Sequence, residues 1–258
     1  MIYSWSEDPI FCFTSDVDWA SEEVLEYSHK ALSGENLNIT YFNTHPSSFI
    51  NSLAKSGEVR QLIHPNFLPN SSHGESFLEV MEYCRRLVPD ADGFRTHRYF
   101  EVNDIMDEYA KRGFKFFSNH CLRCEENITP LHHRSGMVSI PIFFEDGGYL
   151  IMEPDLNTDI LKNRLDSPGL KVINFHAAHM VFNTPKFEFT RKIKDSLSRK
   201  SWNNLDSKAI QSLSYSGFGI RNVLEVIIEH MFKRNHKIMT INQISEEFIA
   251  KKGTQGLI

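Results

Sequence analysis

Hydrophobic and polar positions along the chain follow two alternating patterns. Short apolar runs are each followed by a segment in which apolar residues recur with a helical period. The runs predict seven strands, at residues 10–14, 39–43, 59–63, 93–96, 114–118, 137–144 and 171–175. Helices are predicted at residues 20–33 and 47–55, from Ser76 to Val88 and from Val102 to Gly113.

Strands that alternate with helices indicate a parallel sheet covered by helices. About seven strands in this order predict an α/β fold, a single distorted seven-stranded (β/α) barrel. The pair Ser76 and Glu79 has the spacing of a capping box, which supports a helix start there. From about Lys186 onward the pattern is helical, and its clearest apolar stripe runs from Ile220 to Met231. The barrel is therefore expected to end in a helical C-terminal tail.

Polar side chains gather where the predicted strands end. Asp16 and Asp18 follow the first strand, His64 the third, Arg95 the fourth and His176 the last. In parallel α/β folds the carboxyl ends of the strands share one face, and active sites are built on that face. A single aspartate at a strand end is usually a helix cap, but four strands ending this way predict an active centre.

The two aspartates favour a bound cation. A period of two places Asp16 and Asp18 on the same side of an extended segment, where their charges repel unless a positive group lies between them. A divalent ion, Arg95 or a shared proton would each offset this repulsion. His64 and His73 add neutral nitrogen donors, and one carboxylate with two imidazoles is a common catalytic metal set with an open position.

Length and charge limit the remaining options. The chain has 258 residues, 41% of them hydrophobic, which suits one domain over residues 1–258 with a core at about 8–185 and a helical extension at about 186–258. The net charge of −5 without a dense basic run argues against nucleic acid as a partner. With no signal-like N-terminus and no long apolar run, we expect no membrane span and a cytoplasmic location.

At this point the motifs resemble the polysaccharide deacetylase family, that is, carbohydrate esterase family 4 with the NodB-homology fold, and within it the WbmS-like branch. The resemblance covers about residues 8–185 and implies a distorted seven-stranded barrel. It lies in the segments Thr14–Asp18, His64–Gly74, Phe94–Arg98, Glu145–Asp146 and Asn174–His176. Agreement in order over five segments is more specific than any one of them.

The resemblance assigns a role to each motif residue. It implies that Asp16 is the general base and that Arg95 positions it. His176 would be the general acid. The metal ligands would be Asp18, His64 and His73, with His97 and His179 as substitutes for His73, because the usual histidine spacing of four falls on Leu68.

Substrate contacts are expected from Asn66, His97 and Asp146. For Asp146 two further interpretations stay open, an orienting carboxylate for His176 and an ordinary turn before Gly147. Cys121 and Cys124 form a Cys-x-x-Cys pair that would suit a structural zinc together with His132 and His133, although a plain pair of loop cysteines is favoured.

The implied function is a metal-dependent hydrolase that removes an N-acetyl group from a sugar of a bacterial surface polysaccharide or its precursor. The implied cofactor is one divalent metal ion, with zinc preferred, and the partner is an N-acetylated sugar or oligosaccharide. Assembly of the chain into a homo-oligomer remains an open alternative. Two alternatives also remain: an amidohydrolase or deformylase for a non-sugar C–N bond, and a non-catalytic carbohydrate-binding barrel.

Overall fold

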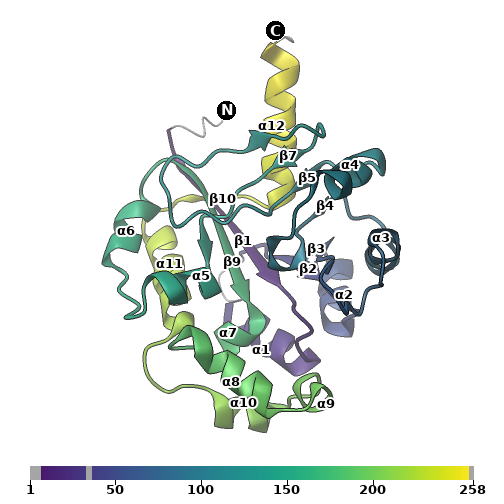
Figure 1. The fold of residues 1–258 in the computed structure, drawn as a ribbon. Coiled ribbons are helices and arrows are strands. Elements are labelled where there is room, and N and C mark those ends of the chain that lie inside the picture. Colours follow the sequence, from purple (N-terminus) through teal and green to yellow (C-terminus); the bar gives the residue numbers. More distant parts are fainter. Residues whose placement is uncertain (1–6, 33–36, 256–258) are drawn as a thin grey trace.

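The centre of the fold is a curled, mostly parallel sheet, which Figure 1 shows around the two long strands β1 and β9. The structure is a computed structural model that describes residues 7–32 and 37–255. Its strands are β1 (Pro9–Asp16), β2 (Thr40–Asn43), β3 (Arg60–Ile63), β4 (Gly93–Phe94), β5 (Phe116–Phe117), β6 (Leu131–His132), β7 (Val138–Ser139), β8 (Phe144–Glu145), β9 (Gly169–His176) and β10 (Lys237–Ile238).

The strand order is β6-β7-β5-β4-β3-β2-β1-β9-β8, and β10 pairs with β1. All pairings are parallel except that of β6 with β7. β7 pairs with β5 near one end of the strand order, and β8 pairs with β9 at the other end. The short chain segment between β7 and β8 therefore connects the two ends of the sheet. This crossing closes the curled sheet into an irregular barrel, as the sequence predicts.

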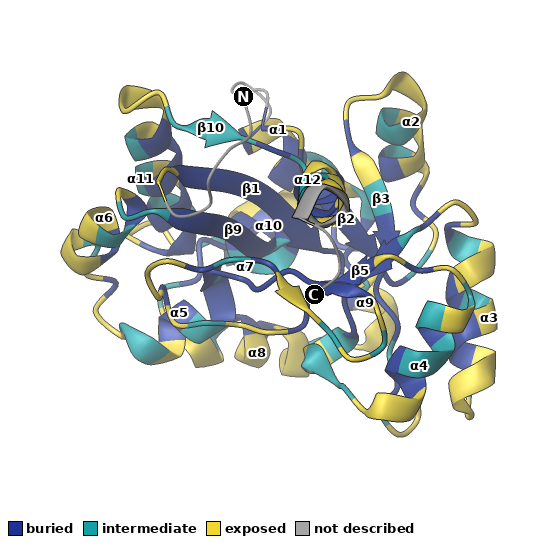
Figure 2. Ribbon diagram, turned by 90° about the horizontal axis from the view of Figure 1, so that it is seen from above, coloured by how far each residue is buried: buried dark blue, intermediate teal, exposed yellow. Residues whose placement is uncertain are grey.

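Helices cover the outside of the sheet, and Figure 2 shows their exposed sides turned away from the buried strands. They are α1 (Glu22–Leu32), α2 (Ser48–Ser56), α3 (Phe77–Leu87), α4 (Asn103–Lys111), α5 (Asp146–Met152), α6 (Asp159–Leu165), α7 (Ala177–Val181), α8 (Phe187–Ser196), α9 (Arg199–Trp202), α10 (Ser207–Leu213), α11 (Ile220–Lys233) and α12 (Ile241–Gln255). A short 3-10 turn, η2, spans His97–Tyr99. No helix among the described residues is long and apolar enough to span a membrane.

Local sequence explains several of these boundaries. The predicted capping box opens α3: the Ser76 hydroxyl accepts a hydrogen bond from the Glu79 N–H, and the Glu79 carboxylate accepts one from the Ser76 N–H. Gly57 ends α2 in a left-handed conformation with φ of 81°, which glycine adopts without a steric penalty. All eight residues of β1 are buried because neighbouring strands pair with both of its edges and side chains pack on both of its faces.

All seven predicted strands are present, with two differences in detail. The predicted strand at 137–144 is two short strands, β7 and β8, because the chain there changes partner from β5 to β9. β6 and β10 are additional strands of two residues each. The predicted helix at 20–33 is α1, and residue 33 lies outside the described residues.

The C-terminal region wraps around the barrel rather than extending from it. α8 and α10 lie near the end of the molecule at which β1 and β9 finish, and α12 lies at the opposite end (Figure 1). α11 packs against α6 and α7. The region is mostly helical, as predicted, but β10 adds a strand whose Lys237 and Ile238 pair with Ile10 and Phe11 of β1.

Candidate active site

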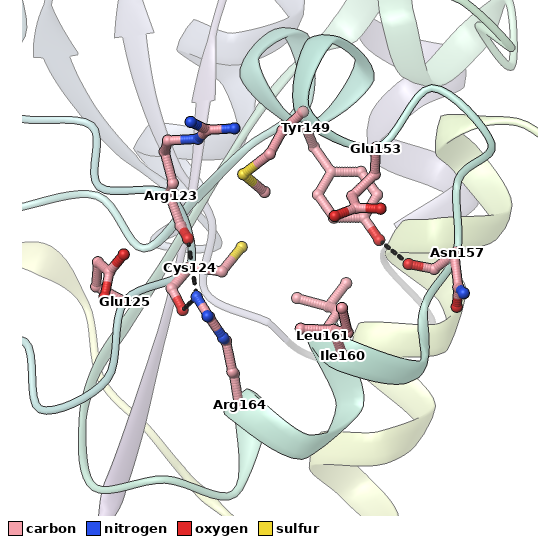
Figure 3. Close-up of a pocket in the computed structure, with 10 residues that line it drawn as sticks. Arg123, Cys124, Glu125, Tyr149, Glu153, Asn157, Ile160, Leu161 and Arg164 are labelled. Carbon is pink, nitrogen blue, oxygen red and sulfur yellow. Dashed lines mark hydrogen bonds between the residues drawn. The ribbon is translucent and has the colours of Figure 1, made fainter.

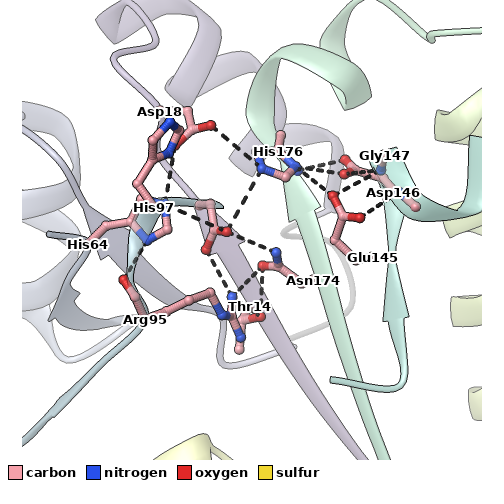
Figure 4. Close-up of polar contacts among 12 residues, drawn as sticks. Thr14, Asp18, His64, Arg95, His97, Glu145, Asp146, Gly147, Asn174 and His176 are labelled. Carbon is pink, nitrogen blue, oxygen red and sulfur yellow. Dashed lines mark hydrogen bonds and ion pairs between the residues drawn. The ribbon is translucent and has the colours of Figure 1, made fainter. Parts of the chain in front are cut away.

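The carboxyl ends of four strands converge on one group of polar side chains, drawn in Figure 4. Asp16 is the last residue of β1 and lies beside His176, the last residue of β9, in the parallel register. His64 follows β3 and Arg95 follows β4. The structure therefore brings together the residues that the strand-end pattern predicts, and each position follows from where a strand stops.

Asp16 is held as a buried carboxylate. Its Oδ1 accepts a hydrogen bond from Arg95 Nη1 at 2.9 Å, and its Oδ2 accepts one from Asn174 Nδ2 at 3.0 Å. Burial alone would raise the pKa of Asp16, but the charge of Arg95, followed by those of His64 and His176, outweighs burial and lowers it. The Asp16 carboxylate therefore stays ionised and fixed in direction.

Arg95 is itself completely buried, so its charge depends on the groups around it. Its Nε donates to the Ser118 carbonyl at 2.9 Å, and Nη2 donates to the Ser118 hydroxyl at 3.0 Å. The guanidinium lies 4.2 Å from the ring centre of Phe42. These contacts fix the orientation of Arg95, which in turn sets the direction of Asp16.

A carboxylate and two imidazoles form the second part of the site. Asp18 Oδ1 lies 3.3 Å from His64 Nε2 and 3.2 Å from His97 Nδ1. These three ligand atoms all lie within 4.8 Å of one another. Burial would raise the pKa of Asp18, but hydrogen bonds from His64 and His97 bring it well below its ordinary range. We call Asp18, His64 and His97 the ligand group.

The ligand group fits a divalent cation. His64 Nδ1 lies 2.7 Å from the Arg95 carbonyl oxygen, which can only accept, so Nδ1 carries the proton in the neutral ring. In that neutral form the lone pair of Nε2 faces Asp18 and can bind a cation placed between them, whereas a protonated ring donates from Nε2 to Asp18. A backbone carbonyl that fixes the tautomer in this way is the usual support of a metal-binding histidine. One carboxylate and two imidazoles leave a coordination position open for substrate.

Asp18 reaches the ligand group by a different backbone path from the one predicted. β1 ends at Asp16, and Asp18 and Trp19 have left-handed backbones with φ of 45° and 57°. The two aspartates therefore do not alternate along one extended segment. Trp19 is tied to the next strand connection, because its N–H donates to the Thr44 hydroxyl at 3.1 Å.

The structure does not bring His73 into the ligand group. Its Nδ1 accepts a hydrogen bond from the Asn66 backbone N–H at 3.1 Å, and its ring stacks on Tyr83 with centroids 4.6 Å apart. Burial lowers the pKa of His73 to about 4, so the ring is neutral. His97, predicted as a substrate contact or a substitute ligand, lies beside Asp18 and His64.

His176 is paired with Asp146 on the side away from Asp16 and Asp18. Its Nδ1 lies 2.6 Å from Asp146 Oδ1, and its backbone N–H donates to Asp146 Oδ2 at 2.6 Å. His176 Nε2 faces Asp16 and Asp18, at 3.8 Å and 3.6 Å. Burial would lower the pKa of His176, but Asp146, Asp18 and Asp16 raise it well above its ordinary value.

Asp146 is completely buried and begins helix α5. A carboxylate with both oxygens turned to His176 fits an orienting role better than the predicted contact with substrate. Glu145 caps the same helix by accepting hydrogen bonds from the N–H groups of Gly147 and Gly148. Burial and the neighbouring charge of Asp146 raise the pKa of Glu145 to about 7.

Two adjoining pockets open beside this centre. One, of about 170 Å³, is lined by Asp18 and His176 and by side chains of α8 and α9. The other, of about 500 Å³, is lined by Trp19 and Asn66 together with α9. Lys194 and Trp202 line both, so the pockets are neighbours. The C-terminal region thus supplies one wall of the space in front of the site.

A further pocket, of about 290 Å³, lies around Cys124 between α5 and α6 (Figure 3). Arg164 points into it but donates to the carbonyls of Arg123 and Cys124. Burial raises the pKa of the Cys124 thiol to about 12, while Cys121 is exposed. No cluster of metal-ligand atoms in the described part of the chain includes either cysteine.

Two residues that contact Asp16 or Arg95 were not predicted as site residues. Asn174 donates to Asp16 and accepts from Arg95 Nη1, and Thr14 accepts from the same Nη1 at 3.0 Å. Thr14 and Asn174 are paired in the register of β1 and β9. Each lies two residues before Asp16 or His176, so a period of two would have placed both on the site's face of the sheet.

Solved structures share this fold at low identity. WbmS of Bordetella bronchiseptica, assigned as a polysaccharide deacetylase involved in O-antigen biosynthesis, superposes with a TM-score of 0.73 at 22% identity, over 87% of this chain and 91% of that one. The peptidoglycan N-acetylglucosamine deacetylase Bc1960 superposes with a TM-score of 0.50 at 12% identity, over 93% and 89% of the two chains. Identities this low establish similarity of fold alone.

The comparison by sequence is more specific. None of the curated proteins matches the chain. Residues 13–194, however, match the family described as WbmS-like polysaccharide deacetylase. This range begins inside β1 and ends inside α8, so it contains every strand end that contributes to the site. The chain therefore belongs to the WbmS-like polysaccharide deacetylase family.

Proposed function

We propose that this protein is a metal-dependent hydrolase that removes the N-acetyl group from a sugar of a bacterial surface polysaccharide or its precursor. One observation carries the proposal: an ionised carboxylate, a metal-ligand group and a protonated histidine meet at one end of the barrel. Amide hydrolysis needs these three functions, namely activation of water, polarisation of the carbonyl and protonation of the leaving amine.

The ligand group, Asp18, His64 and His97, would hold the divalent ion. Zinc is the expected metal because it accepts mixed nitrogen and oxygen ligands. When bound, the ion supplies a Lewis acid that polarises the acetyl carbonyl. This assignment replaces His73 by His97, and the position of the His97 ring beside Asp18 supports it.

Asp16 acts as the general base. Its pKa is lowered, so it is ionised at neutral pH, and Arg95 and Asn174 hold both oxygens in place. It removes a proton from the attacking water. Arg95 is a positioning residue here, because it is completely buried and acts through Asp16.

His176 acts as the general acid. Its Nδ1 is bound to Asp146, so the proton available to the substrate is the one on Nε2, which faces the centre. An amide nitrogen cannot leave as an anion at neutral pH, and protonation by His176 releases it as an amine. The lowered pKa of Asp16 and the raised pKa of His176 separate the roles of base and acid.

The pockets beside the site support a sugar as substrate. Trp19, Trp202 and Asn66 line the pockets next to Asp18 and His176, where aromatic and amide side chains suit a sugar. The relative WbmS is assigned to O-antigen biosynthesis, which favours a surface-polysaccharide sugar. We further propose that the enzyme works in the cytoplasm, on a precursor such as a nucleotide-linked or lipid-linked N-acetyl sugar.

The decisive experiment measures acetate release from N-acetyl compounds, and formate release from N-formyl compounds, by the zinc-loaded protein. The panel of compounds holds N-acetylated nucleotide sugars, N-acetylated oligosaccharides and, as non-sugar amides, N-formyl and N-acetyl amino acids. We expect release from a sugar, lost in Asp16→Asn and kept in the control Asp159→Asn, whose carboxylate is exposed. Activity on the non-sugar amides alone would support an amidohydrolase or deformylase instead. Sugar binding without release from any compound would support a non-catalytic barrel.

A further inference from the structure

A second cluster of two histidines and an aspartate lies outside the site described above. Asp166 follows α6, His230 lies in the last turn of α11, and His236 lies just before β10. His230 Nε2 is 2.9 Å and His236 Nε2 is 3.0 Å from the same oxygen, Asp166 Oδ1. The three ligand atoms all lie within 4.8 Å of one another.

The cluster repeats the arrangement of the ligand group at the strand ends. In both places one carboxylate oxygen faces two imidazole nitrogens, at 3.2 and 3.3 Å for Asp18 and at 2.9 and 3.0 Å for Asp166. The other oxygen of Asp166 faces Arg234 Nη2 at 3.5 Å. Arg234 therefore contacts Oδ2, and Oδ1 contacts the two imidazole rings.

The ring of His236 is held by more than Asp166. It stacks on Phe11 of β1, with ring centroids 5.4 Å apart and planes 16° apart. The two histidine side chains are 16% and 15% exposed, and that of Asp166 is 37% exposed. The cluster is thus largely fixed in place but open enough for an ion to enter from solvent and to keep a water ligand.

We propose that Asp166, His230 and His236 form a second binding site for a divalent transition metal, of which zinc is the reference ion. Two imidazoles and a carboxylate suit such ions, and water would complete the coordination. Calcium and magnesium, which prefer sets made of oxygen ligands, do not suit this site.

The position of this site indicates a structural role. It joins the end of α6 to the segment between the last turn of α11 and β10, which lies 64 to 70 residues later in the sequence. β10 pairs with β1, the strand that ends at Asp16. A metal here would fasten the C-terminal region to the catalytic strand at the end remote from the reacting groups.

The test counts zinc bound by the full chain after removal of metal by a chelator. We expect two equivalents in the unaltered protein and one in His64→Ala, which disables only the ligand group. In the His64→Ala background, Asp166→Asn and His236→Gln should each abolish the remaining equivalent. His132→Gln, an exposed histidine on β6, is the matched control and should keep it.

A second measurement distinguishes the loss of the metal site from the loss of the folded state. Zinc should raise the melting temperature of His64→Ala and leave that of the His64→Ala, Asp166→Asn double variant unchanged, with both folded by circular dichroism. A single equivalent in the unaltered protein that His64→Ala removes would overturn the proposal. So would a second equivalent that survives Asp166→Asn. Neither result depends on deacetylase activity, so the two proposals fail separately.

Discussion

The carboxylate of Asp146 holds His176 twice, through Nδ1 of the ring and through the backbone N–H, each at 2.6 Å. A ring fixed in this way can present only Nε2 to the substrate. The same carboxylate is, after the opposing effect of burial, the main reason that the pKa of His176 is raised.

We therefore predict that Asp146→Asn lowers kcat without releasing metal. The variant removes the charge that keeps His176 protonated, so the pKa of His176 falls. The alkaline limb of the profile of kcat/KM against pH should then move to lower pH. The loss at neutral pH should not exceed that of His176→Ala, for which about 10² to 10⁴-fold is expected. An unshifted alkaline limb would show that Asp146 does not raise the pKa of the general acid.

The metal set gives a second prediction. Asp18→Asn, His64→Ala and His97→Ala should each remove the ion from the strand-end site, because three ligands are the fewest that usually hold a catalytic zinc. His73→Ala should keep it, since Nδ1 of His73 accepts from the Asn66 N–H and the neutral ring therefore carries its proton on Nε2, which leaves no free lone pair for a metal. Elemental analysis of the purified variants measures the metal content of each. Loss in His73→Ala and retention in His97→Ala would restore the ligand set predicted from the sequence.

The buried pair of Arg95 and Asp16 gives a third prediction, about stability. Arg95→Met leaves Asp16 as a buried charge without its nearest cation, which should cost about 3–5 kcal/mol of unfolding free energy. Asp16→Asn in the same chain removes the uncompensated charge, so the double variant should recover part of that loss. Urea unfolding of the four proteins in the double-mutant cycle gives the coupling. Strict additivity would show that the two side chains do not interact.

His73 gives a fourth prediction, about the dependence of stability on pH. Its pKa in the folded state, about 4, lies below its ordinary value, so the unfolded chain binds the proton more readily. The contribution of His73 is therefore complete above about pH 6.5 and declines as the pH falls toward 4, by at most about 1.4 kcal/mol per pH unit. His73→Gln should have a shallower decline over this range. An equal slope in both proteins would contradict the prediction.

Much of the fold could be predicted from periodicity because the strands of a parallel barrel are apolar on both faces. The runs at 10–14 and 171–175 became β1 and β9, each longer than predicted. β10 could not be predicted, since Lys237 and Ile238 are too few to show a strand pattern and pair only because the C-terminal region folds back onto β1.

The site could be predicted in part, because strand ends place Asp16, His64, Arg95 and His176 without any knowledge of loops. His97 and His73 lie in connections, where apolar periodicity carries no information. His97 is in η2, and the next two residues, Arg98 and Tyr99, both have left-handed backbones with φ of 56°. No pattern of apolar and polar residues encodes such a turn, so the sequence could not show that the ring of His97 lies beside Asp18.

The pairing of β1 also constrains how the protein assembles. Residues 10–16 make their sheet contacts with residues 170–176, and residues 10 and 11 also pair with residues 237 and 238. Contacts this distant in sequence form slowly, because a long loop must close before they are gained. During synthesis, Asp16 therefore cannot contact Asn174 and His176 until most of the chain has been made. A C-terminal truncation that removes β10 would leave Ile10 and Phe11 of the catalytic strand without a partner on that edge, exposed to association with other chains.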